Sequence, residues 1–303
     1  MEATVRSLAV DRVSAEVVDA LRVAGAEGLL LKGPVFAAWL YRDGAARAYV
    51  DTDILVSPRD FPVAQRALAG IGFSTHIDDT DTPGWRQVAH HWVRARDGAN
   101  VDLHRTLVGV GVPDAELWDV VSADAEPFSV AGREVRTPGV PVRALHIALH
   151  AAQHGTRAGK HLDDLERALC MVDPAVWRSA RGIADRLSAT GAFATGLRLC
   201  EPGCRLADEL GVFADGSVET TLLAGAPAAG ALGWHYLASA RGVRARSHIV
   251  ARKLFPTRRF MRAWSPVARR GPVGLAAAYV ARPVWVLGRV VPGFWAWWRA
   301  RGE

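Results

Sequence analysis

The chain has 303 residues, of which half are apolar and 22% are charged, a balance typical of a globular protein with one large or two ordinary domains. Its three cysteines are too few and too clustered for a disulfide framework, and we expect Cys200 and Cys204 to be reduced thiols in the core. The start, MEATVRSLAVDRVS, has neither the basic residues nor the apolar run of a signal peptide, which favours a cytoplasmic location.

Charge is distributed unevenly. Positions 241–303 hold 14 of the 37 Lys and Arg residues and one acid, a net charge of +13, whereas the first 240 residues carry −7. We therefore expect this tail to meet an acidic partner. Three partners fit: the chain's own N-terminal domain under a pair of packed helices, an anionic membrane beneath a Trp-rich basic helix, or a nucleic acid. A membrane-spanning helix is not expected, because Arg282, Pro283, Arg289 and Pro292 interrupt the most apolar part.

The N-terminal region alternates helical and extended patterns. Ser14 fits a helix N-cap, and Pro34 and Pro58 fit first helical turns. In chain order the pattern predicts a helix over 14–26, a buried strand over 29–31, a helix over 35–43, a strand over 50–56 and a helix over 57–69.

Two carboxylates, Asp51 and Asp53, lie two residues apart in the second predicted strand and should therefore point to one face. Adjacent acids repel unless a cation lies between them, and a divalent metal is the usual solution. Lys32 and Gly33 form a turn before a helix, where phosphate binds well. This pattern indicates metal-dependent chemistry on a nucleoside triphosphate; alternatively, Asp-Thr-Asp merely ends a strand. Arg47 either reaches a phosphate or pairs with Asp51 or Asp53.

Further along, residues 74–86 are expected to form a loop, and residues 88–107 a hairpin that turns at Asp97-Gly98. In its second strand Asp102 and His104 share one face, so Asp102 would bring a third carboxylate to the two acids. Short pieces follow, with another strand pair over 128–135.

Beyond a soft boundary at residue 140 the pattern becomes helical. His146, His150 and His154 share one face of a helix over 142–153, where they either bind zinc or line a polar core or pocket. Acids including Asp164 open the next helix, over 161–171, as the helix dipole favours. Further helices are expected from Pro174 and over 192–211 and 218–240. The predicted domains are a nucleotide-handling domain over 1–140, a helical domain over 141–240 and a basic, Trp-rich helical region over 241–303.

Together, LLLKGPVFAAWLY, Arg47, VDTDILV, VDLH, HIALHAAQHG and LDDLERAL resemble the uncharacterised nucleotidyltransferase family of the DNA polymerase beta-like superfamily. The resemblance implies an α+β fold with a mixed sheet, followed by helices. It also implies that Asp51 and Asp53 hold two Mg²⁺ or Mn²⁺ ions and that Asp102 completes the triad and helps to deprotonate the attacking hydroxyl.

By the same resemblance, Lys32 and Gly33 would lie at the triphosphate, where the wider superfamily usually has Gly-Ser. Arg47 would neutralise phosphate or support the acids, and His104, His150 and His154 would line the cleft towards the acceptor. The expected reaction transfers a nucleoside monophosphate from a triphosphate such as ATP to a hydroxyl or phosphate of a small molecule, a peptide or protein, or RNA, and releases pyrophosphate. A toxin that modifies tRNA is a special case. The alternative is a non-catalytic module that binds a nucleotide or protein and is anchored by its basic tail.

Overall fold

The computed structural model describes residues 2–75, 87–156, 159–214, 221–222, 230–240 and 242–302. The chain forms two compact units, one of residues 1–75 and 88–215, the other of residues 76–87 and 216–303. The loop predicted over 74–86 lies, from residue 76 onward, outside the described residues.

The first unit is built on a seven-stranded mixed sheet with the order β3-β4-β5-β2-β1-β7-β6. β2 pairs with β5 in parallel and with β1 in antiparallel orientation, which places β2 near the centre. The strands are β1 Gly28–Leu30, β2 Thr52–Val56, β3 Ser74–Thr75, β4 Ala89–Arg94, β5 Ala99–His104, β6 Glu126–Val130 and β7 Arg133–Thr137. The two predicted hairpins are therefore present as β4–β5 and β6–β7.

Helix α1, Glu2–Val23, packs against the sheet and against α3, Phe61–Gly70. It begins well before the predicted N-cap, and Ser14 is a buried mid-helix residue whose hydroxyl lies 2.8 Å from the Thr52 hydroxyl on β2. The Ser14 cap was therefore a wrong prediction. Because neighbouring strand residues point to opposite faces, the contact of Thr52 with α1 turns Asp53 towards the other face of the sheet.

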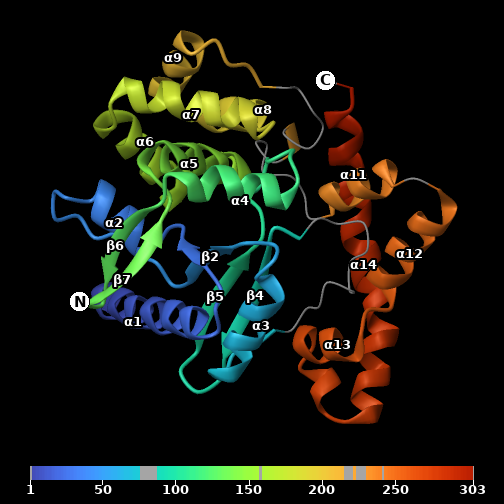
Figure 1. The fold of residues 1–303 in the computed structure, drawn as a ribbon. Coiled ribbons are helices and arrows are strands. Elements are labelled where there is room, and N and C mark those ends of the chain that lie inside the picture. The colour runs from blue at the N-terminus through green and yellow to red at the C-terminus, as the bar shows by residue number, and fades with distance from the viewer. Residues whose placement is uncertain are drawn as a thin grey trace. The chain divides into compact units, whose positions relative to one another are not determined.

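The remaining helices of the first unit extend one continuous core from the sheet, and three of them, α6, α7 and α8, contact α5. In Figure 1 the remaining helices form, apart from the blue α2, the green to yellow stack on one side of the sheet, while the dark blue α1 lies on the other. They are α2 Pro34–Leu40, α4 Asp114–Ala123, α5 Val140–His154, α6 Lys160–Met171, α7 Pro174–Arg186, α8 Thr190–Leu197 and α9 Glu201–Glu209. The predicted mixed α+β fold is confirmed.

Several local predictions differ from the structure. The helix expected from residue 57 starts at Phe61, because Ser57 opens a turn in which its carbonyl accepts from the Asp60 amide. The single helix expected over 192–211 is divided into α8 and α9, and α4 falls in a region predicted as short mixed pieces. The three cysteines are free; Cys200 and Cys204, expected in the core, are partly buried.

The second unit is helical over its described residues and ends in one long helix. Its elements are α11 Ala231–Ser239, α12 Val243–Leu254, α13 Arg258–Trp264, the 3-10 turn η2 Val267–Arg269 and α14 Pro272–Ala300. Helix α14 contacts α11, α12, α13 and η2. Part of the helix expected over 218–240 lies outside the described residues.

Helix α14 continues through Pro283 and Pro292, the residues expected to interrupt it. It is long and apolar enough to cross a membrane by length and composition, so the expectation that no segment of the tail could span a membrane is not supported on that measure. One such helix is weak grounds for a spanning segment, because helices of water-soluble proteins also meet this measure.

The contact between α8 and α5 yields a stability prediction. A Cβ atom at Gly196 would lie 1.9 Å from the Ala148 carbonyl oxygen, whereas at Gly182, on the exposed face of α7, nothing lies within 4 Å. We predict that Gly196→Ala lowers the free energy of unfolding by about 1–3 kcal/mol through overpacking. Gly182→Ala should raise it by up to about 1 kcal/mol through helix propensity. Urea denaturation measures both, and equal effects would contradict the close α5–α8 contact.

Candidate active site

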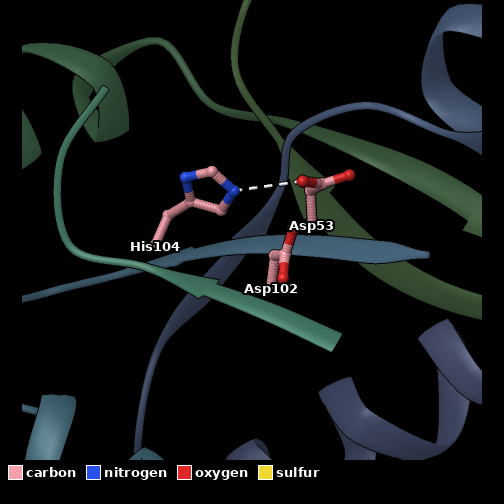
Figure 2. Close-up of side chains that lie close together, drawn as sticks. All are labelled: Asp53, Asp102 and His104. Carbon is pink, nitrogen blue, oxygen red and sulfur yellow. Dashed lines mark hydrogen bonds and ion pairs between the residues drawn. The ribbon is translucent and has the colours of Figure 1, made fainter. Parts of the chain in front are cut away.

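The centre of the sheet brings two predicted carboxylates together. In the parallel β2–β5 pair, Asp53 lies directly opposite Asp102, and the next but one pair places Leu55 opposite His104. Asp53 is buried, with 1% of its side chain exposed, while Asp102 remains 28% exposed. The predicted common face of Asp53, Asp102 and His104 is present (Figure 2).

The Asp53 carboxylate forms an ion pair with Lys32 and a hydrogen bond with His104. Lys32 Nζ and His104 Nε2 each lie 3.0 Å from Asp53 Oδ1. The second oxygen, Oδ2, is buried and has no hydrogen-bond partner in the described part of the chain. A buried carboxylate oxygen without a partner is costly unless a ligand or ion completes its coordination.

The Asp53 carboxylate and the Lys32 ammonium group each stabilise the charged form of the other. Burial alone would raise the pKa of Asp53, but the Lys32 charge and the His104 hydrogen bond outweigh it and hold that pKa well below its usual value. Burial lowers the pKa of Lys32, yet Asp53, with Asp51 and Asp102, raises it overall. The pKa of Asp51 is raised, first by burial and then by the charge of Asp53.

The donor set fits a divalent cation. One donor atom each from Asp53, Asp102 and His104 lie within 4.8 Å of one another, and the partnerless Asp53 Oδ2 offers a further ligand. Carboxylate oxygens are the ligands that Mg²⁺ prefers. Asp51 is not in this group of described residues: it precedes β2 by one position, and its link to Asp53, Asp102 and Lys32 is electrostatic.

The Lys-Gly turn requires its glycine. Gly33 has a φ of 68°, in the left-handed region that favours glycine, and caps the start of α2. A Cβ there would meet the Tyr49 ring at 3.5 Å and the Asp51 carbonyl at 3.7 Å. The turn therefore places Lys32 against the carboxylates. Phosphate binding by Lys32 and Gly33 stays a prediction.

Arg47 has a different partner from those considered in the sequence. Its Nε and Nη2 atoms each donate to a carboxylate oxygen of Asp164 on α6 at 2.7 Å, and Nη1 donates to the Gly33 carbonyl at 3.3 Å. The Tyr41 hydroxyl donates to the same carboxylate at 2.8 Å. Both members of the ion pair are buried. Arg47 thus ties the Lys-Gly turn to α6, rather than pairing with Asp51 or Asp53.

The three histidines of α5 do not share one environment. His146 and His150 are buried and His154 is exposed, with ring centroids 6.3 Å apart for the first pair and 4.6 Å for the second. Burial, with the nearby Lys32 charge, lowers the pKa of His146 to about 3 and that of His150 well below its ordinary value. Both rings are therefore neutral near pH 7, and neither joins the carboxylate group identified among the described residues.

A comparison with protein families identifies the chain. The model of the family described as uncharacterised nucleotidyltransferase matches residues 1–202, about two thirds of the chain. The chain belongs to the uncharacterised nucleotidyltransferase family. The matched segment includes every candidate residue of the site, so the resemblance noted in the sequence is confirmed as family membership, although residue roles are not tested by it.

No curated protein matches this nucleotidyltransferase in sequence. Among solved structures, it is similar to the solution structure of the antibiotic-resistance factor ANT(2'')-Ia, which is reported to reveal substrate-regulated conformation dynamics. The TM-score is 0.44 and the identity 14%, and the match covers 62% of this chain and 96% of the other.

Two contacts of the site were not predicted from the sequence. His91, directly opposite Asp102 in the β4–β5 pair, places Nδ1 2.8 Å from Asp102 Oδ1. Counting residues back along both strands from the Asp97-Gly98 turn pairs His91 with Asp102, so this contact could have been predicted from the sequence. Asp164 was expected only to complement a helix dipole, and no sequence signal connects it with Arg47, 117 residues away.

The buried Arg47–Asp164 pair yields a stability prediction. Asp164→Asn would leave the Arg47 guanidinium buried without its carboxylate, which typically costs about 3–5 kcal/mol of unfolding free energy. The matched control is Asp43→Asn, which removes the acid of the exposed Arg167–Asp43 pair and should leave stability almost unchanged. Urea denaturation measures the free energy of unfolding of both variants. An equally small loss in Asp164→Asn would show that the buried pair does not stabilise the fold.

The buried His146 yields a pH prediction. Since its pKa falls from 6.5 in the unfolded chain to about 3, the unfolded state binds more protons between these values. Stability should therefore be complete above pH 6.5 and decline as the pH falls towards 3, by about 1.4 kcal/mol per pH unit from this group. His146→Leu should flatten the decline, whereas His248→Leu, at an exposed position, should not. If the free energy of unfolding depends on pH equally steeply in the wild type and in both variants, His146 is not a neutral, buried group.

Proposed function

We propose that this member of the family is a metal-dependent nucleotidyltransferase that moves a nucleoside monophosphate from a nucleoside triphosphate to a hydroxyl or phosphate of an acceptor. Family membership supports transfer of this general kind. The observation that carries the proposal is the pairing of Asp53 and Asp102 on adjacent strands, with Asp53 Oδ2 buried and without a hydrogen-bond partner among the residues that the structure describes.

In this proposal Asp53 and Asp102, with Asp51 beside them, hold Mg²⁺ or Mn²⁺. The bound metal supplies positive charge that stabilises the oxygens entering and leaving the α-phosphorus. Asp53 is suited to this role because Lys32 keeps it ionised at any pH near neutrality. His104 holds Asp53 Oδ1 and so leaves Oδ2 directed away from the hydrogen bond.

The residues of the chain would divide the remaining tasks. Asp102 accepts the proton of the acceptor hydroxyl as that oxygen bonds to the α-phosphorus, and the bond from the α-phosphorus to the bridging oxygen breaks to release pyrophosphate. His91 orients the Asp102 carboxylate. Lys32, with Gly33 leaving the backbone accessible, contacts the triphosphate. Arg47 supports this turn through Asp164 and the Gly33 carbonyl, rather than by touching phosphate itself.

The acceptor side is assigned to the helical part of the first unit. His104 lies beside the carboxylates, and the rings of His150 and His154 lie 4.6 Å apart on α5, where the proposal assigns them to the acceptor. The neutral imidazole of His150 offers one donor and one acceptor, which suits a hydroxylated or phosphorylated acceptor better than a strongly cationic one. We propose a small molecule, a peptide or protein side chain, or RNA as the acceptor class.

A turnover assay tests the proposal. We predict that purified protein with Mg²⁺ or Mn²⁺ consumes one or more of the four NTPs, alone or with RNA or a cell extract, and releases pyrophosphate. Asp53→Asn should lower the rate at least about a hundredfold, because a catalytic metal contributes several kcal/mol to the transition state. Asp119→Asn, on the exposed face of α4, is the matched control.

Two results would contradict the proposal. Turnover that survives Asp53→Asn would mean that another site or a contaminant performs the reaction. Failure of every NTP to bind with either metal would instead favour a non-catalytic binding module.

A further inference from the structure

Helix α14 exposes an unbroken apolar stripe. Its members recur every three or four residues and so lie along one side of the helix. The stripe runs over about 38 Å, at 1.5 Å per residue. Val273, Val280 and Val284 are 83%, 77% and 72% exposed. The stripe consists of the exposed residues Val273, Ala277, Val280, Val284, Leu287, Val291, Trp295 and Trp298.

The opposite side of α14 is fixed within the second unit. Ala278, Val286 and Trp297 are buried, and Trp234 of α11 stacks on Trp297 with ring centroids 6.2 Å apart. Arg282 is buried as well, where its Nε donates to the Lys253 carbonyl and its guanidinium lies 4.7 Å from the Phe260 ring centroid. The helix therefore has one packed side and one apolar side without a partner among the described residues.

The surroundings of the stripe are strongly cationic. Residues 230–240 and 242–302 contain 13 Lys and Arg residues and no Asp or Glu. Most of these basic side chains are exposed, on α12, on α13, around η2, within α14 and at its C-terminal end: Arg244, Arg246, Lys253, Arg258, Arg259, Arg262, Arg269, Arg270, Arg289, Arg299 and Arg301. An apolar stripe combined with exposed cations complements an anionic lipid surface, which offers hydrocarbon beneath negative headgroups.

We propose that the second unit binds the surface of an anionic lipid bilayer, with the stripe of α14 immersed at the boundary between headgroups and acyl chains. Trp295 and Trp298, at the C-terminal end of the stripe, are the side chains that favour this boundary. A nucleic acid would engage the arginines but would leave a 38 Å apolar stripe in water. The inference is independent of the catalytic proposal.

The packing of α14 favours a helix that lies on the surface over one that spans the bilayer. A spanning α14 would carry Arg282 and Arg289 into the hydrocarbon, where each charge is costly. It would also separate Arg282 from Lys253, Phe260 and Trp264, its contacts on α12 and α13. Lying in the interface preserves these contacts and immerses only the stripe.

A cavity at the C-terminal end of the stripe is consistent with the same partner. It has a volume of about 1040 Å³ and is lined by aromatic and aliphatic side chains, among them Trp234, Phe255 and Trp298, together with Arg246 and Arg301. Trp298 belongs to both the stripe and the cavity. A largely apolar lining with two cations suits an anionic amphiphile.

The test is co-sedimentation of the full-length protein with vesicles of phosphatidylcholine alone or mixed with phosphatidylglycerol. We expect salt-sensitive binding to the anionic vesicles and little to the neutral ones. Leu287→Asp should weaken binding more than about tenfold, because it removes the burial of one large apolar side chain and adds a charge. Val23→Asp, at a 90% exposed valine of the first unit, is the matched control. Far-UV circular dichroism checks that each variant retains its helices.

Three results would overturn the inference. The first is no binding to either kind of vesicle. The second is loss of self-association in Leu287→Asp, measured by sedimentation velocity, without loss of vesicle binding, which would make the stripe an interface between copies. The third is resistance of the membrane-bound protein to alkaline carbonate extraction, which would indicate a spanning helix.

Discussion

The site depends on keeping one carboxylate, Asp53, ionised at the centre of the sheet. Burial opposes that charge, and Lys32 and His104 outweigh the penalty through contacts to a single oxygen. The Ser14–Thr52 contact with α1 turns the neighbouring Asp53 to the other face of the sheet, and the register of β2 with β5 places Asp102 beside it. The remaining oxygen of Asp53 then has no partner within the described part of the chain, as expected of a carboxylate whose coordination a metal would complete.

A second buried ion pair connects this group with the helices. Asp164 of α6 binds Arg47 through both of its oxygens, and Arg47 in turn donates to the carbonyl of Gly33, next to Lys32. A cation that controls Asp53 is thus positioned by a residue of the helical part. Because sheet and helices share one hydrophobic core, this coupling acts within one compact unit.

Much of the site follows from local rules that the sequence displays. Strand alternation was sufficient to predict the common face of Asp102 and His104, and the Asp97-Gly98 turn predicted their hairpin. Contacts between distant segments, such as Arg47 with Asp164 and Ser14 with Thr52, were not predictable. The sequence offers a plausible local role for Arg47 as a phosphate ligand, for Asp164 as a partner of the helix dipole and for Ser14 as a helix cap. Helix α14 shows a third limit: packing maintains a helix through Pro283 and Pro292, although each removes a backbone donor.

Metal binding, measured without turnover, tests whether Asp53 is a metal ligand. Titration of the protein with Mn²⁺ under electron paramagnetic resonance counts free and bound ions for the wild type, Asp53→Asn and the exposed-acid control Asp119→Asn. We predict saturable binding in the wild type and the control, and its loss in Asp53→Asn. Equal, saturable binding in all three proteins would show that the metal lies elsewhere and would contradict the assignment of this site.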